Sequence, residues 1–275
     1  MFIPLLLLLV FSYYPALKLL QLSFTDWDGF SRDIRYIGFK NFIEIFKDPN
    51  MLMPIINNLG YLLIMFLYNA LALYLAIILC TKIRFTNFFK STIFLPYIIN
   101  GVAIALIFNY LYDYNSGPLN VILRLFGSQG VHWLSDSYFI NVSLCFIGVW
   151  RYMGYIMVGF IASLSSIPPT LYESADIDGA NFFQKIRYIT IPSIKRTIEL
   201  YLILGINGSL QVFEQIWIIT KGGPGHRSET AVVSIWNNAF TYKDFGMASA
   251  LAVLLVVIIF SLVSIQRKVL RTEAD

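Results

Sequence analysis

Six long apolar stretches alternate with shorter polar segments along the chain. They run from Phe2 to Phe24, Pro54 to Cys80, Thr92 to Tyr112, Phe139 to Ser165, Ile198 to Ile219 and Phe245 to Ile265. A hydrocarbon core of about 30 Å is crossed by about 20 helical residues, and every stretch reaches that length. Because backbone polar groups in lipid must be satisfied within their own segment, the pattern predicts an all-α membrane protein with six transmembrane helices. No internal repeat or low-complexity linker is visible, so residues 1–275 are expected to form a single domain.

One polar segment, residues 166–196, has the sequence signals of two short helices joined by a turn. Thr170 is followed three residues later by Glu173, and Asn181 is followed at the same distance by Gln184. This is the spacing of a capping box, in which the two side chains satisfy backbone amides at the start of a helix. The segment is therefore predicted to hold two helix starts.

The turn and the end of this segment are marked by glycine and proline. Gly179 can adopt the positive φ that ends a helix, so a first helix is predicted over Leu171–Ile177. Pro192 lacks an amide proton and disfavours helical angles at the residue before it, which predicts that the second helix stops near Ile189. The result is a polar helix-turn-helix between two membrane spans.

Composition agrees with a membrane protein and excludes other classes. Hydrophobic residues make up 57% of the chain and charged residues 13%, with a mean hydropathy of +0.68. An ordinary soluble domain has about 25% charged residues. The net charge is +4, but no basic cluster with interleaved aromatics is present, so nucleic acid is not expected as a partner. Cys80 and Cys145 lie in apolar runs without metal-site spacing, which argues against a metal site or a disulfide framework.

The distribution of Lys and Arg predicts the orientation. Ten lie in three short stretches at residues 82–90, 185–196 and 267–271, while eight are spread over longer segments that also carry acidic residues. Short cytoplasmic loops are enriched in Lys and Arg. This bias places the helix-turn-helix and both termini in the cytoplasm.

Several motifs, in their order along the chain, resemble one known family. Residues Glu173 to Ala175, Asp178 to Ala180 and Ile189 to Pro192 are similar to the cytoplasmic EAA loop of permease subunits of ABC importers. Further resemblance to the carbohydrate-importing branch, which includes the maltose and glycerol-phosphate permeases, lies in the runs SFTDWDGF, YIGFKNFIEIFKDP, GPLNVILRLFG, WLSD and TKGGPG. Ser174 stands where the family usually has alanine, and Lys90 where an arginine is common.

The resemblance implies the permease subunit of an ATP-driven, binding-protein-dependent importer of sugars or oligosaccharides in the plasma (inner) membrane. The implied partners are a second permease, favoured as a different chain over a second copy, two cytoplasmic ATPase subunits, an extracytoplasmic solute-binding protein and membrane lipid. The chain contains no GxxxxGK(S/T) loop, so it is not expected to be an enzyme or to carry a cofactor. ATP and Mg are expected on the ATPase subunits. The first span, residues 2–24, is expected outside the core.

Within the coupling loop, residues 166–196, the resemblance implies contacts with the ATPase from Glu173, Ser174, Ala175, Asp178, Gly179, Ala180, Phe182 and Phe183. The carboxylates are suited to pair with cations on that partner, the small residues permit close approach, and the aromatic rings can fill an apolar groove. The alternative is an amphipathic loop on the lipid surface, which Lys185 and Arg187 also favour.

Polar residues in the fifth span indicate a substrate pathway. Asn207, Gln211 and Glu214 recur at intervals of four and three residues, so they share a helical face, with Gln215 beside them. Such groups are expensive in hydrocarbon and are usually functional, although interhelical hydrogen bonding explains the same stripe. The resemblance also places substrate contacts here. The predicted pathway residues are Arg151, Tyr155, Asn207, Ser209, Gln211, Val212, Glu214 and Gln215.

Arg151 lies near the middle of the fourth span and needs a partner or water at that depth. Glu214 is the predicted partner. Trp150, Tyr152 and Tyr155 offer flat surfaces for a sugar ring.

Two other classes of function stay open on the residues alone. An ion-gradient-driven secondary transporter also needs several spans and a polar stripe, although the first half of the chain has no counterpart of the polar helix-turn-helix. An integral-membrane enzyme needs clustered carboxylates or histidines at one membrane face, and the sequence shows no such cluster. His132 and His226 are isolated in outer loops and are expected to be solvated.

Overall fold

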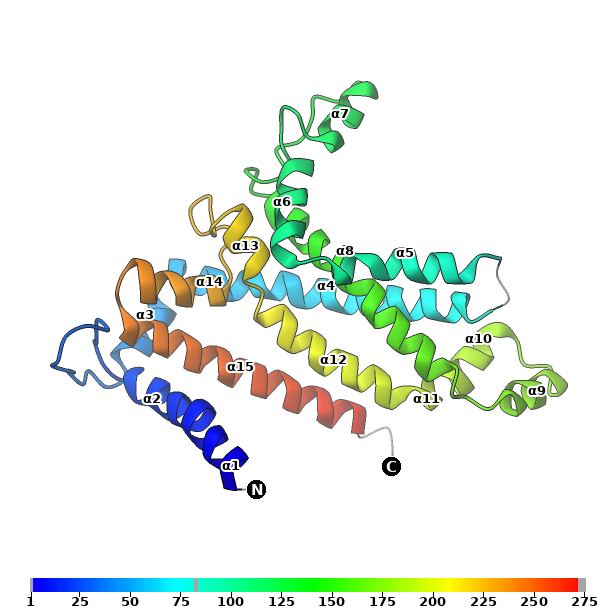
Figure 1. Ribbon diagram of the computed structural model, residues 1–275, viewed down its shortest axis with the longest axis horizontal. Coiled ribbons are helices and arrows are strands. Elements are labelled where there is room, and N and C mark those ends of the chain that lie inside the picture. Colours follow the sequence, from blue (N-terminus) through cyan, green and yellow to red (C-terminus); the bar gives the residue numbers. More distant parts are fainter. Residues whose placement is uncertain (1, 82–83, 272–275) are drawn as a thin grey trace.

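The computed structural model describes residues 2–81 and 84–271, and this part of the chain is helical apart from its loops and an isolated antiparallel bridge between Thr25 and Tyr36. The long helices form a bundle, from which α6 and α7 stand away as an arm (Figure 1). In chain order the elements are α1 (Phe2–Leu8), η1 (Leu9–Tyr13, a π-helix), α2 (Tyr14–Leu22), α3 (Lys40–Lys47), α4 (Pro49–Leu79), α5 (Thr86–Ile98), α6 (Gly101–Leu111), α7 (Pro118–Leu125), α8 (Phe139–Leu164), α9 (Pro169–Ile177), α10 (Phe182–Lys185), η2 (Ile186–Thr190, a π-helix), α11 (Ile191–Ser193), α12 (Lys195–Leu210), α13 (Glu214–Ile219), α14 (Ala231–Trp236), η3 (Asn237–Thr241, a π-helix) and α15 (Phe245–Arg271).

Among the described residues, five helical spans are long and apolar enough to cross a membrane, and the bent pair α5–α6 makes a sixth if it is counted as one. The predicted all-α, multi-span architecture is therefore confirmed. The third span predicted over Thr92–Tyr112 is divided into two helices, because α5 and α6 meet at 99°. Ile99 is extended, and Asn100 caps the new helix by accepting a hydrogen bond from the Val102 amide at 2.9 Å.

The core lies where α4, α8 and α12 pack together. Its centre holds Met65, Ala72 and Ala76 from α4 with Met157 and Phe160 from α8, all of them buried. Small residues such as the two alanines let helices approach closely, which is how membrane helices gain packing contacts without a hydrophobic driving force. A second cluster packs α6 and α13 against α8.

The first span lies on the outside of the bundle, where α2 runs against α15 (Figure 1). None of its apolar stretch, Ile3–Leu22, is buried within the chain. Its leucines are therefore available to lipid or to another subunit.

The predicted helix pair is present at one end of the bundle, where α9 and α10 project near the C-terminal end of α15 (Figure 1). Gly179 has a φ of +74°, and Asn181 and Gln184 form a complete capping box. The cap predicted at Thr170 is wrong. α9 already begins at Pro169, and a proline is well suited to the first turn because the amide it lacks has no partner there.

The predicted end of the second helix near Ile189 is also wrong. The chain stays helical through η2 and α11, and it bends only at Ile194 before α12. Pro192 lacks the amide for a normal α-helical bond, and the π-helical turn ending two residues earlier accommodates it. A π-helical turn, Leu9–Tyr13, likewise ends two residues before Pro15 in the first span.

The arm ends in a small lobe around α7. The buried side chain of Asn120 donates to the Val131 carbonyl at 2.9 Å and accepts from the Val131 amide at 2.8 Å and from Trp133 Nε1 at 3.1 Å. His132 is exposed, as expected for a solvated loop residue, and its ring stacks on Tyr114 with centroids 3.8 Å apart.

Candidate functional site

A cavity of about 470 Å³ opens between α4, α5, α8 and the segment from α12 to α13. Most of the predicted pathway residues line it, namely Arg151, Tyr155, Ser209, Gln211, Val212, Glu214 and Gln215. Asn207 does not line it; its side chain is exposed and accepts a hydrogen bond from Gln211 Nε2. The structure thus brings the predicted residues together, while their part in transport stays a prediction.

The continuous polar face predicted for the fifth span is wrong, because the helix is interrupted in the cavity wall at residues 211–213. Asn58 Nδ2 donates to the Ser209 carbonyl at 2.9 Å, and Thr230 Oγ1 donates to the Val212 carbonyl at 2.6 Å. These side chains replace hydrogen bonds that a continuous helix would make itself. Non-helical backbone at membrane depth is tolerated where protein groups satisfy it or a cavity adjoins it, and both conditions hold here.

The predicted contact between Arg151 and Glu214 is present. Arg151 Nη1 donates to Glu214 Oε2 at 3.1 Å, and the two side chains are 20% and 43% exposed. The Arg151 guanidinium also lies 5.4 Å from the centre of the Tyr152 ring. Trp150 does not line the cavity and packs against Phe108 instead. The cavity wall therefore carries an ion pair that is partly open to the cavity.

Gly101, which is not one of the predicted site residues, lies directly against this ion pair. A Cβ placed on Gly101 would lie 1.7 Å from Glu214 Oε2 and 2.5 Å from Arg151 Nη1. The ion pair thus packs on the backbone of the bent span, where α6, α8 and α13 meet. The available signal was the Asn-Gly dipeptide at residues 100–101, a strong turn signal inside an apolar run.

Tyrosine rings form another wall of the cavity. Tyr155 stacks on Tyr97 with centroids 4.4 Å apart and planes 16° apart, and it meets Tyr201 edge-on at 5.8 Å. Tyr61 and Tyr68 of α4 extend this wall. Tyr97 and Tyr201 were not predicted, because no local pattern distinguishes them among the 17 tyrosines of the chain. Aromatic faces beside polar edges suit a ring-shaped polar solute.

The α9–α10 pair presents apolar side chains to its surroundings. Ile177 is 88% exposed, Phe182 54% and Phe183 79%. Of the other residues predicted to contact a partner, Glu173, Ser174, Asp178 and Gly179 are exposed and Ala180 is half-buried. Ala175 is buried against the chain itself, so it supports the helix pair from within and is not available for close approach by a partner.

Three contacts close the helix pair on itself. Lys185 forms an ion pair with Asp176, and the Tyr172 hydroxyl lies 2.9 Å from Thr190 Oγ1. The Ala180 amide donates to the carbonyl of the buried Ala175 at 2.9 Å. The pair is therefore a preformed protrusion.

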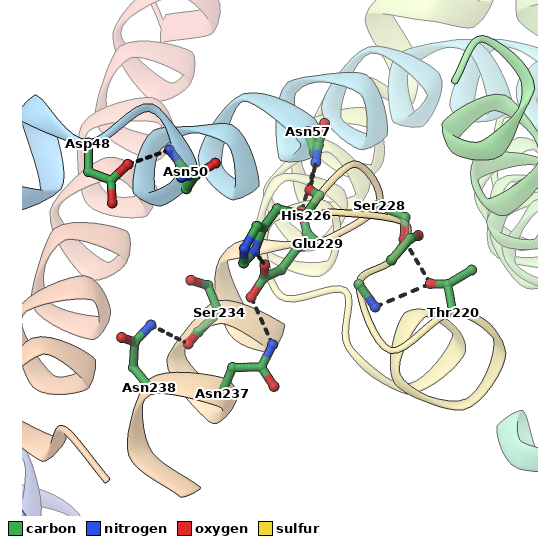
Figure 2. A network of polar contacts seen from close by, with 12 residues as sticks. Asp48, Asn50, Asn57, Thr220, His226, Ser228, Glu229, Ser234, Asn237 and Asn238 are labelled. Carbon is green, nitrogen blue, oxygen red and sulfur yellow. Dashed lines mark hydrogen bonds and ion pairs between the residues drawn. The ribbon is translucent and has the colours of Figure 1, made fainter. Parts of the chain in front are cut away.

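At the opposite end of the bundle, a polar network ties the loop before α14 to α4 (Figure 2). Asn57 Nδ2 donates to the carbonyls of Glu229 at 2.9 Å and His226 at 3.3 Å. The Glu229 carboxylate is almost fully buried, accepts from Asn237 Nδ2 at 2.9 Å and contacts His226 Nδ1. His226 is therefore half-buried and paired with Glu229, and the prediction that it is solvated is wrong.

Comparisons with known proteins cover nearly the whole chain. The family described as "Binding-protein-dependent transport system inner membrane component" matches residues 1–272. The probable ABC transporter permease protein YurN of Bacillus subtilis is 34% identical over 278 residues, which cover 99% of this chain and 95% of that protein. The diacetylchitobiose uptake system permease protein NgcF of Streptomyces coelicolor is 31% identical, covering 93% of this chain and 76% of that protein. The crystal structure of a bacterial ABC transporter that imports the acidic polysaccharide alginate shares the fold, with a TM-score of 0.86 at 23% identity over 98% of this chain and 92% of that chain.

Proposed function

Because this chain belongs to the family of binding-protein-dependent transport system inner membrane components, we propose that it is the permease subunit of an ATP-driven importer whose cargo is a sugar or an oligosaccharide. It is a multi-pass membrane protein and not itself an enzyme. The relatives are ABC permeases, which favours this function over an ion-gradient-driven transporter. A relative named for diacetylchitobiose uptake supports a carbohydrate cargo.

The observation that carries the cargo proposal is the cavity wall of stacked tyrosines beside polar groups. Tyr97 and Tyr155 present flat apolar faces, while the Gln211 amide and the Glu214 carboxylate offer hydrogen bonds to hydroxyl groups. Pockets for small molecules usually have volumes of about 300 to 1,000 Å³, and this cavity of about 470 Å³ lies within that range. A neutral sugar ring matches both the faces and the hydrogen-bonding groups.

The α9–α10 pair is the proposed docking element for two cytoplasmic ATPase subunits, which hold the ATP and Mg. Phe182 and Phe183 enter an apolar groove on the ATPase, and Glu173 with Asp178 meet its cationic side chains. Their exposure supports this role, and the Lys and Arg bias supports the cytoplasmic orientation of this end and of both termini. A different permease chain completes the pathway, and an extracytoplasmic binding protein delivers cargo near the loop that carries His226.

Reconstitution into liposomes tests this proposal. The chain is purified with its co-expressed subunits, and uptake of a labelled oligosaccharide is measured with ATP inside and with ion gradients either imposed or dissipated. We expect uptake that requires ATP and the binding protein and that survives an ionophore. Uptake that stops with the ionophore and continues without ATP would support the secondary transporter instead.

A further inference from the structure

A second cavity, of about 570 Å³, lies between the start of α12 and the end of α15, away from the tyrosine-lined pathway. These two helix ends converge near α11 at the end of the bundle that also carries α9 and α10 (Figure 1). Three cationic side chains, Lys195, Arg196 and Arg267, line it together with one carboxylate, Glu199. The lining is therefore positively charged at the membrane boundary.

Two of these cations are available to a ligand. Among the residues that the structure describes, neither Arg196 nor Arg267 makes a hydrogen bond or an ion pair, and both are exposed. Gln266 Nε2 of α15 lies 3.5 Å from the Glu199 carbonyl of α12, a contact that links the two helices and sets the arginines across the same cavity. Guanidinium groups on opposite walls suit a phosphate, which each can bind in a bidentate manner.

Apolar side chains continue from each arginine toward the membrane interior. On α12, Ile203 lies two turns after Arg196, so it shares the face of Arg196, and it lines the cavity itself. On α15, Phe260 lies two turns before Arg267 and is 70% exposed. A free phosphate would contact only the cations. A phospholipid would contact the cations with its headgroup and these apolar side chains with its acyl chains.

We infer that this cavity binds the phosphate-bearing headgroup of an anionic phospholipid, such as phosphatidylglycerol, with its acyl chains along α12 and α15. Basic pockets between membrane spans are suited to such headgroups. Pro192 and Ser193 of α11 also line the cavity, so the lipid braces the junction between the α9–α10 pair and the bundle. With the proposed orientation this lipid belongs to the inner leaflet, whereas the binding itself does not depend on the orientation.

Lipid binding to the purified complex tests this inference. The complex in detergent is titrated with phosphatidylglycerol, phosphatidylcholine or inorganic phosphate, and bound lipid is counted by native mass spectrometry. We expect a preference for phosphatidylglycerol that falls by about thirtyfold in Arg196→Gln/Arg267→Gln, because each of the two cations near an anionic headgroup contributes about 1 kcal/mol. Arg84→Gln, which removes an exposed arginine outside the cavity, should bind like the unchanged protein.

Two further variants separate a lost site from lost folding. Arg196→Lys/Arg267→Lys keeps both charges and should retain most of the binding. Glu199→Gln removes the carboxylate from the lining and should bind phosphatidylglycerol more tightly, a gain that misfolding cannot produce. Unchanged binding by the double glutamine variant, or weaker binding by Glu199→Gln, would overturn the inference. Full displacement of the lipid by inorganic phosphate would assign the cavity to a free anion instead. The readout is independent of uptake, so its failure leaves the proposed function untouched.

Discussion

Gly101 and Glu214 lie so close together that a Cβ on Gly101 would stand 1.7 Å from Glu214 Oε2. The first belongs to the bent span α5–α6 and the second begins α13 after the break in the fifth span. Two interrupted helices therefore meet at one ion pair in the cavity wall. A movement of α13 relative to α8 that widens the cavity therefore also moves the contact between Glu214 and Arg151.

A methyl group at position 101 should disrupt this contact. In Gly101→Ala the added carbon displaces Glu214 or shifts α6, and overpacking of this kind costs about 1–3 kcal/mol. We expect a lower melting temperature in detergent and a loss of most ATP-dependent uptake. Gly60→Ala in α4 is the matched control, because a Cβ there meets nothing within 4 Å, and both measurements should be unchanged. Normal uptake by Gly101→Ala would show that the ion pair can move without consequence.

Reversing the charges tests the ion pair itself. Arg151→Glu and Glu214→Arg each place two like charges at the 3.1 Å contact, and each should abolish uptake. The double reversal restores opposite charges and should recover a measurable part of the uptake. Equal loss in the double variant, at a normal level of assembled complex, would argue that the groups contact substrate separately.

The turn between α9 and α10 depends on the backbone of Gly179. A Cβ there meets nothing within 4 Å, so a larger residue is opposed by the φ of +74° and not by crowding. Left-handed φ costs an ordinary L-residue about 1–2 kcal/mol, and asparagine tolerates it better. Gly179→Val should therefore uncouple ATP hydrolysis from uptake in vesicles, whereas Gly179→Asn should keep most of the coupling. Equal uptake by the two variants would contradict this account of the turn.

The side chain of Asn58 in α4 forms hydrogen bonds with the end of α12 and the start of α14. Its side chain is fully buried, donates to the Ser209 carbonyl at 2.9 Å and accepts from the Ala231 amide at 2.8 Å. Asn58→Leu leaves both groups without this partner, at a cost of about 1–3 kcal/mol for each unsatisfied group. Thermal unfolding in detergent should show a clear loss of stability. Asn115→Leu, which changes an exposed asparagine, should leave it unchanged.

The turn before α7 should loosen in acid. The Asp113 carboxylate accepts from the Ser116 amide at 2.7 Å, the Ser116 hydroxyl at 2.8 Å and the Asn115 amide at 3.0 Å. The bonds from Ser116, followed by the one from Asn115, lower the pKa of Asp113 from its ordinary value of 3.8. Because the folded pKa lies below the unfolded one, the stabilisation is complete above the ordinary value and is lost as the pH falls through the lowered pKa. Protection of the Ser116 amide from hydrogen exchange should fall over that range.

The variant Asp113→Asn removes the titrating group from this turn. Its amide oxygen can still accept from the Ser116 and Asn115 amides, so the turn should form. Protection of the Ser116 amide should then show no step in acid. A step that persists in the variant would have to come from another group.

The residues of the candidate site that could be predicted are those whose charge contrasts with the apolar span around them. Arg151 and Glu214 stand out as charges within apolar spans, and the cost of an unpaired charge there is enough to predict that they meet. Tyr97 does not stand out, because a tyrosine is ordinary in a membrane helix, and the Asn-Gly turn signal at Gly101 does not indicate what the turn packs against. Their place in the site follows from the packing of α5 and α6 on α8, which no local pattern encodes.

The sequence alone determined the class of the protein, the order of its spans and the position of the helix-turn-helix, because hydropathy, caps and turn residues act over a few neighbours. Only the tertiary structure decided where spans break and what meets at the breaks. The third span bends at Asn100. The fifth unwinds at residues 211–213, where Asn58 and Thr230 donate hydrogen bonds to the carbonyls of Ser209 and Val212. Non-helical backbone inside a membrane needs protein groups or a cavity beside it, and the side chains that satisfy the break in the fifth span come from residues far away in the chain.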